Sequence, residues 1–143
     1  MDKEQIVSLA REMIQAGRPF LLATVDDKNQ PQMRWMGGSV LDESLTLWMA
    51  CGATSRKMAQ IRANAAAQLL YSDEKFGQTV TISGRAEVVD CADTKQRLWK
   101  AMPALSRYMS GPDDPGFGVV KFTGTRVELL NMAEGMAPQV AEL

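Results

Sequence analysis

The chain contains 143 residues, of which 45% are hydrophobic and 23% charged, a composition typical of one globular domain with a substantial core. Its net charge of −1 argues against a broad nucleic-acid-binding surface, and no apolar run approaches the ~20 residues that span a bilayer. The absence of histidine excludes Ser-His and Cys-His nucleophile pairs, imidazole bases and His-ligated zinc or haem, so difficult chemistry would depend on a bound cofactor.

The N-terminal segment predicts an amphipathic helix, because apolar residues recur with helical spacing from Ile6 to Met13 before Gly17 ends the pattern. Two further helical segments are predicted, one after Thr54 and one introduced by Asp90.

Seven segments have the apolar or alternating character of β-strands. The run 20–25 is apolar almost throughout, whereas 79–89 alternates as a strand with one buried face does. Gly37 and Gly38 interrupt the second strand and predict a bulge or a close backbone approach. The predicted strands are 20–25, 32–36, 45–50, 66–71, 79–89, 118–122 and 126–131.

Six or seven strands on a sequential antiparallel hairpin plan, with helices as plugs and crossovers, predict a mainly β fold in the form of a small closed barrel. Residues 1–132 would form a single domain, and residues 133–143 a frayed C-terminal tail. The polar N-terminus does not resemble a signal peptide, and the distant Cys51 and Cys91 indicate reduced thiols in a cytoplasmic protein.

Thr54, Ser55, Arg56 and Lys57 provide the strongest indication of function, because they lie where a strand gives way to a helix. Thr54 is expected to be the N-cap, so that the other three fill the first helical turn. Two cations there oppose the helix dipole at a cost of up to about 1 kcal/mol each, unless an anion lies among them. Backbone N–H groups, a hydroxyl, a guanidinium and an ammonium together predict a phosphate site. The alternative is a helix that tolerates two solvated cations.

Three segments of the chain have recognisable sequences. Segment 23–34 begins with Ala-Thr-Val-Asp and ends with Pro-Gln-Met-Arg. Segment 47–57 begins with Leu-Trp-Met and ends with Thr-Ser-Arg-Lys, and segment 83–87 is Ser-Gly-Arg-Ala-Glu. In this order they resemble the FMN-binding split barrel of pyridoxamine 5′-phosphate oxidase and its relatives. The most similar branch is that of the short bacterial proteins related to general stress protein 26. The resemblance covers about residues 20–131. It implies a split β-barrel that forms a homodimer, with two FMN molecules in clefts at the subunit interface.

Matched residue by residue, the resemblance implies that Ser55, Arg56 and Lys57 hold the FMN phosphate and that Arg34 reaches it from the neighbouring strand. Gln78 or Thr79 falls near a position that contacts the flavin ring. With the turn described above, the predicted cofactor-binding residues are Arg34, Trp35, Met36, Met49, Ala50, Thr54, Ser55, Arg56, Lys57 and Thr79. For the apolar members of this set the alternative is packing in the barrel core, whereas an arginine on a short apolar strand needs an anion nearby.

The chain departs from the oxidase itself at several positions. It has Gly37, Gly38 or Ser39 where the oxidase has a lysine, Leu130 in place of a tryptophan, and no Arg- and His-bearing segment for substrate. The resemblance therefore implies an FMN-dependent oxidoreductase for an unknown small molecule, with NADH or NADPH as a candidate donor, rather than a true pyridoxamine 5′-phosphate oxidase. No catalytic side chain is predicted. The alternatives are a non-catalytic stress-response protein that buffers or senses flavin, and a barrel without flavin, since other superfamily members bind haem, deazaflavin or nothing.

Five other residues each have two interpretations. Cys51 near two cations is either a redox-reactive thiol or, as we favour, an inert buried residue. Trp48 is expected in the core, while Trp99 is a candidate for the cleft or the interface. Asp113 and Asp114 lie either at a substrate entrance or in a solvated turn.

Overall fold

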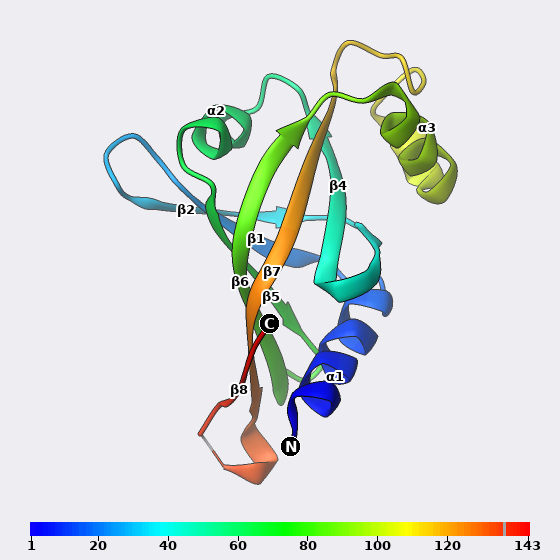
Figure 1. The fold of residues 1–143 in the computed structure, drawn as a ribbon. Helices are drawn as coiled ribbons and strands as arrows, with labels where there is room; N and C mark the ends of the chain where they lie inside the picture. Colours follow the sequence, from blue (N-terminus) through cyan, green and yellow to red (C-terminus); the bar gives the residue numbers. More distant parts are fainter. Residues whose placement is uncertain (136) are drawn as a thin grey trace.

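The computed structural model describes residues 1–135 and 137–143, which form a single antiparallel eight-stranded sheet with helices around it (Figure 1). The helices are α1 (Lys3–Gln15), α2 (Arg56–Ala63) and α3 (Ala92–Ala101), with 3-10 turns η1 (Glu43–Leu45), η2 (Pro103–Arg107) and η3 (Met132–Glu134). The strands are β1 (Phe20–Val25), β2 (Pro31–Met36), β3 (Val40–Leu41), β4 (Thr46–Gly52), β5 (Ala66–Ser72), β6 (Gln78–Val89), β7 (Phe117–Asn131) and β8 (Gln139–Glu142). None of the helices in the described ranges is long and apolar enough to cross a membrane.

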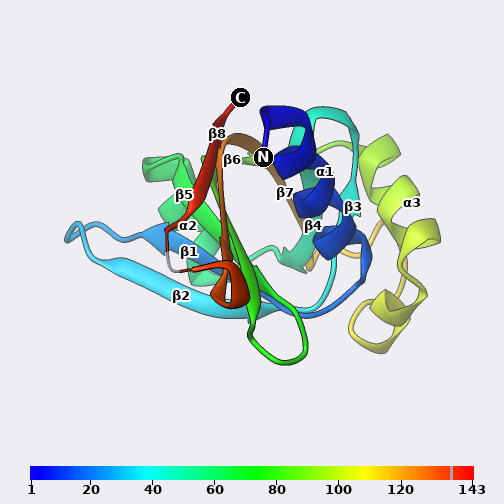
Figure 2. The ribbon, with the colours of Figure 1, turned by 90° about the horizontal axis from the view of Figure 1, so that it is seen from below.

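The strands pair in the order β2-β1-β5-β6-β7-β4-β3, and β8 adds to β7. β2 and β3 are therefore the two ends of the path, although only Gly37–Ser39 separates them in sequence. The four Cα steps from Met36 to Val40 reach at most about 14 Å. The two edges must consequently lie near each other, so the sheet is strongly curled, as the view from below also shows (Figure 2).

The mainly β fold class is confirmed, and the sheet has the form of the split barrel that the resemblance implies. The expectation of a closed barrel is wrong, because β2 and β3 come close at Gly37–Ser39 without pairing with each other. In both ribbon views the β1–β2 hairpin extends away from the curled sheet, on the side opposite α3 (Figures 1 and 2).

The main core fills the inside of the curled sheet. Alternating residues of the strands point inward, in keeping with the period-two patterns in the sequence. Fully buried members are Leu22, Leu47, Leu69, Ile82 and Phe122.

α1 closes this core along one side of the sheet. Asp2 caps the helix, because its side chain accepts a hydrogen bond from the backbone N–H of Gln5, whose side chain in turn accepts one from the N–H of Asp2. Ile6, Ala10 and Ile14 form the buried face against the main core. The predicted amphipathic helix is thus present, with its apolar stripe facing the sheet.

A second, smaller cluster lies under α3, on the other face of β4 and β7. Leu98 is buried there with Phe117 and Val119, and Trp48 and Trp99 pack against them as partly buried residues. Trp48 therefore belongs to this outer cluster and not to the interior of the barrel, where it was expected.

The last part of the sheet differs from the sequence-based expectation. One continuous strand of 15 residues, β7, replaces the predicted strands 118–122 and 126–131. β6 pairs with β7 along its whole length, and a bulge between Ser83 and Gly84 accommodates the extra residue Thr125, whose hydroxyl donates to the Ser83 carbonyl oxygen. Residues 123–125 have the local sequence pattern of a turn, but pairing with β6 holds residues 123 and 124 in the extended strand.

The expectation of a frayed C-terminal tail is wrong for residues 139–142. These form β8, which pairs with β7 and contacts α1. Ala141 is buried in the main core. Met136, which belongs to the predicted tail, lies outside the described residues.

Asp42 joins α3 to the sheet and makes the stability of this contact dependent on pH. Its carboxylate accepts hydrogen bonds from the Arg97 guanidinium and, at 2.9 Å, from the indole N–H of Trp48. These bonds, first that from Arg97, lower the pKa of Asp42 below its usual value. The contribution to stability is therefore fully present above the unfolded-state pKa of ~3.9 and is lost as the pH falls through the lower folded-state pKa.

We expect Asp42→Asn to reduce the free energy of unfolding at pH 7 by no more than about 1 kcal/mol, since the pair is partly exposed. The difference from the unmodified chain should be smaller at about pH 3, below the unfolded-state pKa, than at pH 7. Urea unfolding of both chains at the two pH values checks this. A difference that is the same at both pH values would contradict the assigned role of the carboxylate.

Candidate functional site

The segment predicted to bind phosphate lies at the turn between β4 and α2. The helix begins at Arg56 with Ser55 as its N-cap residue, so the prediction of Thr54 as N-cap is wrong by one position. The Ser55 hydroxyl and backbone N–H both donate to the Gly52 carbonyl oxygen, at 2.8 and 3.1 Å. These two bonds close the turn at Ser55, one residue after the predicted N-cap. Because no side chain caps α2, the first N–H groups of the helix remain available to an anion.

Arg34 extends from β2 towards α2 and is held by neutral groups. It donates to the Thr24 hydroxyl at 2.7 Å, to the Gln60 side-chain oxygen at 3.1 Å and to two backbone carbonyl oxygens. Thr24 itself donates to Gln60 at 2.6 Å, which fixes the group. Burial, and then the positive charge of Arg56, lower the pKa of Arg34 from its ordinary value. Two guanidinium groups thus lie close enough to repel each other.

Within the described residues, no carboxylate lies within salt-bridge distance of the basic side chains of Arg34, Arg56 and Lys57. The ion pairs found there involve other basic residues. Lys57 lies 3.3 Å from the Ser55 hydroxyl. Three cations and the free helix N–H groups form a donor set that fits a phosphate group. An anion there would also relieve the repulsion between the two arginines.

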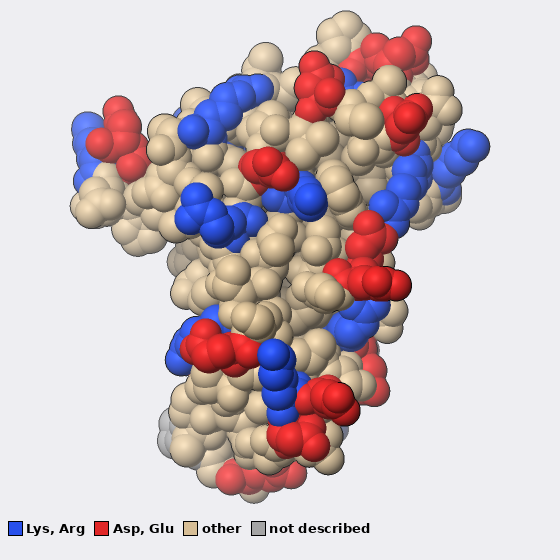
Figure 3. Space-filling model, viewed as in Figure 1, with Lys and Arg blue, Asp and Glu red and all other residues tan. Residues whose placement is uncertain are grey.

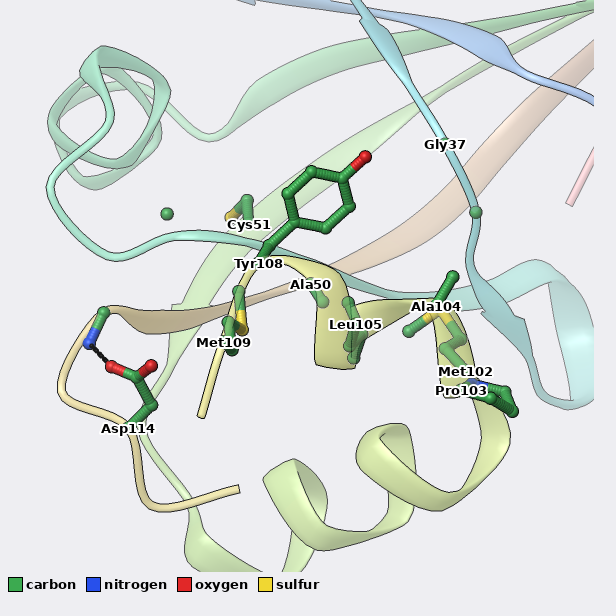
Figure 4. A pocket seen from close by; sticks show the side chains of 13 residues that line it. Gly37, Ala50, Cys51, Met102, Pro103, Ala104, Leu105, Tyr108, Met109 and Asp114 are labelled. Atoms are coloured by element: carbon green, nitrogen blue, oxygen red, sulfur yellow. Dashed lines mark hydrogen bonds between the residues drawn. The ribbon is translucent and has the colours of Figure 1, made fainter. Parts of the chain in front are cut away.

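A cavity of about 720 Å³ lies beside this turn (Figure 4). The last residues of β4, Ala50–Gly52, line one side, and Gly37 and Gly38 line another. A Cβ atom on Gly37 would meet nothing within 4 Å, and one on Gly38 would lie 3.7 Å from the Met102 sulfur. The backbone is therefore open to the cavity at these glycines, and the volume suits a ligand of drug-like size.

The other predicted cofactor-binding residues on β2 and β4 are divided between different surfaces. Alternation along β2 places Trp35 on the face opposite Arg34, with its side chain 67% exposed, so the barrel-core alternative is wrong for Trp35. Met36 and Met49 do lie in the main core. Ala50 lines the cavity.

The remaining two predicted residues lie outside the cavity lining. Thr54 is exposed in the turn before α2, and Thr79, half-buried on β6, pairs with Leu130 of β7. Their assignment to a cofactor stays a prediction, as it does for Gln78, the alternative to Thr79.

The sequence analysis missed Thr24 and Gln60, which position Arg34. Thr24 is the one polar residue of an apolar strand, and Gln60 follows Arg56 by one helical turn, so both could have been noticed. It also missed the wall of the cavity after α3, whose location depends on tertiary packing.

Cys51 lines the cavity but is largely buried, with its sulfur 3.4 Å from that of Met58. Burial raises the pKa of the thiol, and the opposing effect of nearby Lys57 is smaller. The thiol is therefore held in its protonated form, which agrees with the inert interpretation.

Solved structures with the same fold span nearly the whole chain. General stress protein 26 from Bacillus anthracis str. Sterne has a TM-score of 0.76 and 22% identity, over 99% of this chain and 98% of that one. A Clostridium acetobutylicum protein related to general stress protein 26, of the pyridoxinephosphate oxidase family, has a TM-score of 0.84 and 16% identity, over 100% and 97%. A pyridoxamine 5′-phosphate oxidase-related, FMN binding protein from Nostoc punctiforme PCC 73102 has a TM-score of 0.73 and 13% identity, over 100% and 97%.

No curated protein matches the chain significantly. The model of the family described as pyridoxamine 5′-phosphate oxidase matches residues 7–131, which include both the turn before α2 and the strand that carries Arg34. The resemblance found in the sequence is thereby confirmed. The chain belongs to the pyridoxamine 5′-phosphate oxidase family.

Proposed function

We propose that the chain binds FMN, with the phosphate held between the Ser55–Lys57 turn and Arg34. The observation that carries this proposal is that Arg34 donates to Gln60, one helical turn from Arg56 at the uncapped N-terminus of α2, and that neither arginine has a carboxylate partner among the described residues. Such an arrangement is unfavourable unless an anion is bound. The FMN binding protein from Nostoc punctiforme with the same fold supports this choice of ligand.

The cavity beside the turn is the place available for the flavin ring. Cys51 and Gly52 line it and lead within three residues to Ser55, so phosphate site and cavity are contiguous. The open backbone at Gly37 and Gly38 would let a flat ring approach closely. The apolar walls would exclude water from its reactive edge.

We infer that the protein is an oxidoreductase, because bound FMN supplies hydride or electron transfer that the side chains of this chain cannot. Its partner in the reaction is a small molecule, with NADH or NADPH as the proposed electron donor. The alternative is a non-catalytic protein that buffers or senses flavin. The cavity extends beyond Ala50–Gly52, and this further part favours the oxidoreductase role. A protein that only carries flavin has no need of a second surface that binds another small molecule.

Titration of ligand-free protein with FMN, followed by flavin fluorescence and absorbance, tests the proposal. We expect saturable binding of one FMN per chain and bleaching of the bound flavin by NADH or NADPH under anaerobic conditions. Binding without reduction would favour the flavin-buffering alternative. A folded protein that does not bind FMN would overturn the proposal.

We further propose a homodimer that uses the outer face of the β1–β2 hairpin. Met33 and Trp35 point outward from the edge strand β2, with 68% and 67% of their surface exposed. Leu21 pairs with both Trp35 and Leu70, which continues the apolar surface across β1 to β5. A contiguous apolar patch beside an unpaired strand edge is typical of a protein interface. The family resemblance supports a second copy of this chain as the partner.

We expect Trp35→Glu to convert the dimer to a monomer, because the carboxylate would be buried without a partner in the interface. Sedimentation velocity at several protein concentrations checks this. Phe76→Glu is the matched control, since Phe76 is an exposed aromatic residue outside this patch. A Trp35→Glu chain that sediments as the unmodified one does would refute this location of the interface.

The surface charge favours a small-molecule ligand over nucleic acid. On the face shown in Figure 3, Lys and Arg side chains are interspersed with Asp and Glu instead of forming a broad basic surface. Cys51 and Cys91 are both free thiols, which suits the reducing cytoplasm that we expect for this protein.

A further inference from the structure

The wall of the cavity that faces β4 comes from the segment after α3. α3 ends at Ala101, Pro103 follows, and the short turn η2 then places apolar side chains along the cavity. Met102, Leu105, Tyr108 and Met109 belong to this wall. In the close-up, Leu105 is drawn beside Ala50, and Tyr108 beside Cys51 (Figure 4).

Tyr108 is the most exposed member of this wall. Its side chain is 80% exposed, and its ring extends over the cavity between Cys51 and Gly37 (Figure 4). An aromatic ring that lies over a cavity with little packing of its own offers a free face for stacking. A flat ligand in the cavity would bury this face.

The charge of the cavity is opposite to that of the neighbouring phosphate site. Asp114 is the one charged residue among those that line it, and neither Lys nor Arg belongs to the lining in the described part of the chain. The Asp114 carboxylate accepts from the N–H and hydroxyl of Ser110, at 2.9 and 3.2 Å, and from the N–H of Gly116 at 2.8 Å. These bonds, first that from the Ser110 N–H, lower the pKa of Asp114, so the group stays ionised at neutral pH. A second anion entering the cavity would therefore meet a fixed negative charge.

We propose that the Met102–Met109 side of the cavity binds an uncharged aromatic ring system, stacked against Tyr108, and discriminates against phosphorylated or otherwise anionic compounds. This rests on the proposed function, in which FMN occupies the basic turn and the β4 side of the same cavity. The apolar wall supplies the contact area, Tyr108 the stacking surface and Asp114 the discrimination. The site would thus accept an uncharged aromatic compound beside the flavin.

A matched pair of probes tests this specificity by binding alone. 1-Naphthol and 1-naphthyl phosphate share one ring system and differ in charge. Equilibrium dialysis with FMN-saturated protein should show that naphthol binds severalfold more tightly, because the phosphate would enter a cavity whose one charged lining residue, within the described part of the chain, is the Asp114 carboxylate. Saturation with FMN is essential, since an empty basic turn would itself attract the phosphate.

The result can be separated from that of the FMN titration. If FMN does not bind, the same dialysis on Arg56→Ala protein, whose phosphate site is weakened, still compares the two probes in the cavity. A preference for naphthol there would uphold the proposed specificity without the flavin. Equal or tighter binding of naphthyl phosphate, in FMN-saturated or in Arg56→Ala protein, would overturn it.

Variants assign the effect to individual residues. Tyr108→Ala should lower the affinity for naphthol about threefold to tenfold, while Tyr108→Phe, which keeps the ring, should not. Because the side chain is exposed, these variants should fold normally. Asp114→Asn should raise the affinity for naphthyl phosphate severalfold and leave that for naphthol unchanged. Unchanged naphthol binding in Tyr108→Ala, or the loss produced equally by Phe76→Ala outside the cavity, would refute the stacking site.

Discussion

Arg56→Ala is expected to weaken FMN binding by about tenfold to hundredfold. A hydrogen bond to a charged group contributes roughly 1.5–3 kcal/mol, which corresponds to this range of dissociation constants. Arg56 is exposed at the first position of α2 and makes no ion pair within the described residues, so its removal should not disturb the fold. Titration of the ligand-free variant with FMN, with flavin fluorescence as the readout, measures the effect.

Arg62→Ala is the matched control. Arg62 lies in the last turn of the same helix, is also exposed, and carries the same charge at the opposite end of the dipole. Its removal should leave the FMN affinity nearly unchanged. An equal loss in both variants would mean that net charge, and not the geometry of the turn, governs binding.

Thermal unfolding provides a second measure of the same variant. Without FMN, Arg56→Ala should be at least as stable as the unmodified chain, because the repulsion on Arg34 is relieved. With FMN in excess, the unmodified chain should gain stability through mass action, and the variant should gain less. A variant that is destabilised without ligand would instead indicate that Arg56 has a structural role.

Gly84→Ala is expected to lower the free energy of unfolding by about 3 kcal/mol, at the upper end of the range for overpacked sites. A Cβ atom there would overlap the backbone carbonyl oxygen of Thr123 and lie 2.7 Å from Cζ of Phe122. The oxygen belongs to the paired strand β7 and cannot rotate away as a side chain would. Gly84 also adjoins the bulge that sets the register of β6 against β7, so relief of the overlap requires the two strands to separate.

Gly37→Ala is the matched control, since a Cβ atom at Gly37 has open space around it. Chemical denaturation should show a change of less than about 1 kcal/mol for this variant. If the two alanine variants lose similar stability, the close approach of β6 and β7 at Gly84 does not have the assigned role.

The local patterns predicted the parts of the fold that depend on nearby residues. The helical spacing from Ile6 and the apolar run at 20–25 correspond to α1 and β1, because each buries one regular face against the core. The continuity of β7 was not predictable in this way. Thr123-Gly124-Thr125 locally resembles a turn, but pairing with β6, together with the pair that Thr123 makes with Thr46 of β4, keeps it extended. β8 is short and mostly polar on its exposed face, so it carries no clear strand pattern.

In the candidate site, too, features that depend on nearby residues were predictable, and features that depend on tertiary packing were not. The basic turn was predicted in its correct place, but its N-cap was not, because the Ser55 hydroxyl is used to close the turn on Gly52. Period-two alternation along β2 already implied that Arg34 and Trp35 face opposite sides of the strand. The wall around Tyr108 could not be foreseen, since its position depends on how α3 packs over β4 and β7.

The strand order also has a consequence for how the protein folds. Among the described strands, β4, which leads into the basic turn, pairs with β3 and with β7, and β7 lies far along the chain. Arg34 is on β2, at the other end of the same strand order. The strand that leads into the basic turn is therefore fully paired only once β7 has joined it, and such contacts between distant parts of the sequence form slowly, on the scale of milliseconds to seconds in mainly β domains. We expect amide hydrogen exchange to show α2 and β4 becoming protected late in refolding, together with β7, so that the ligand-binding residues acquire their arrangement in the final cooperative step.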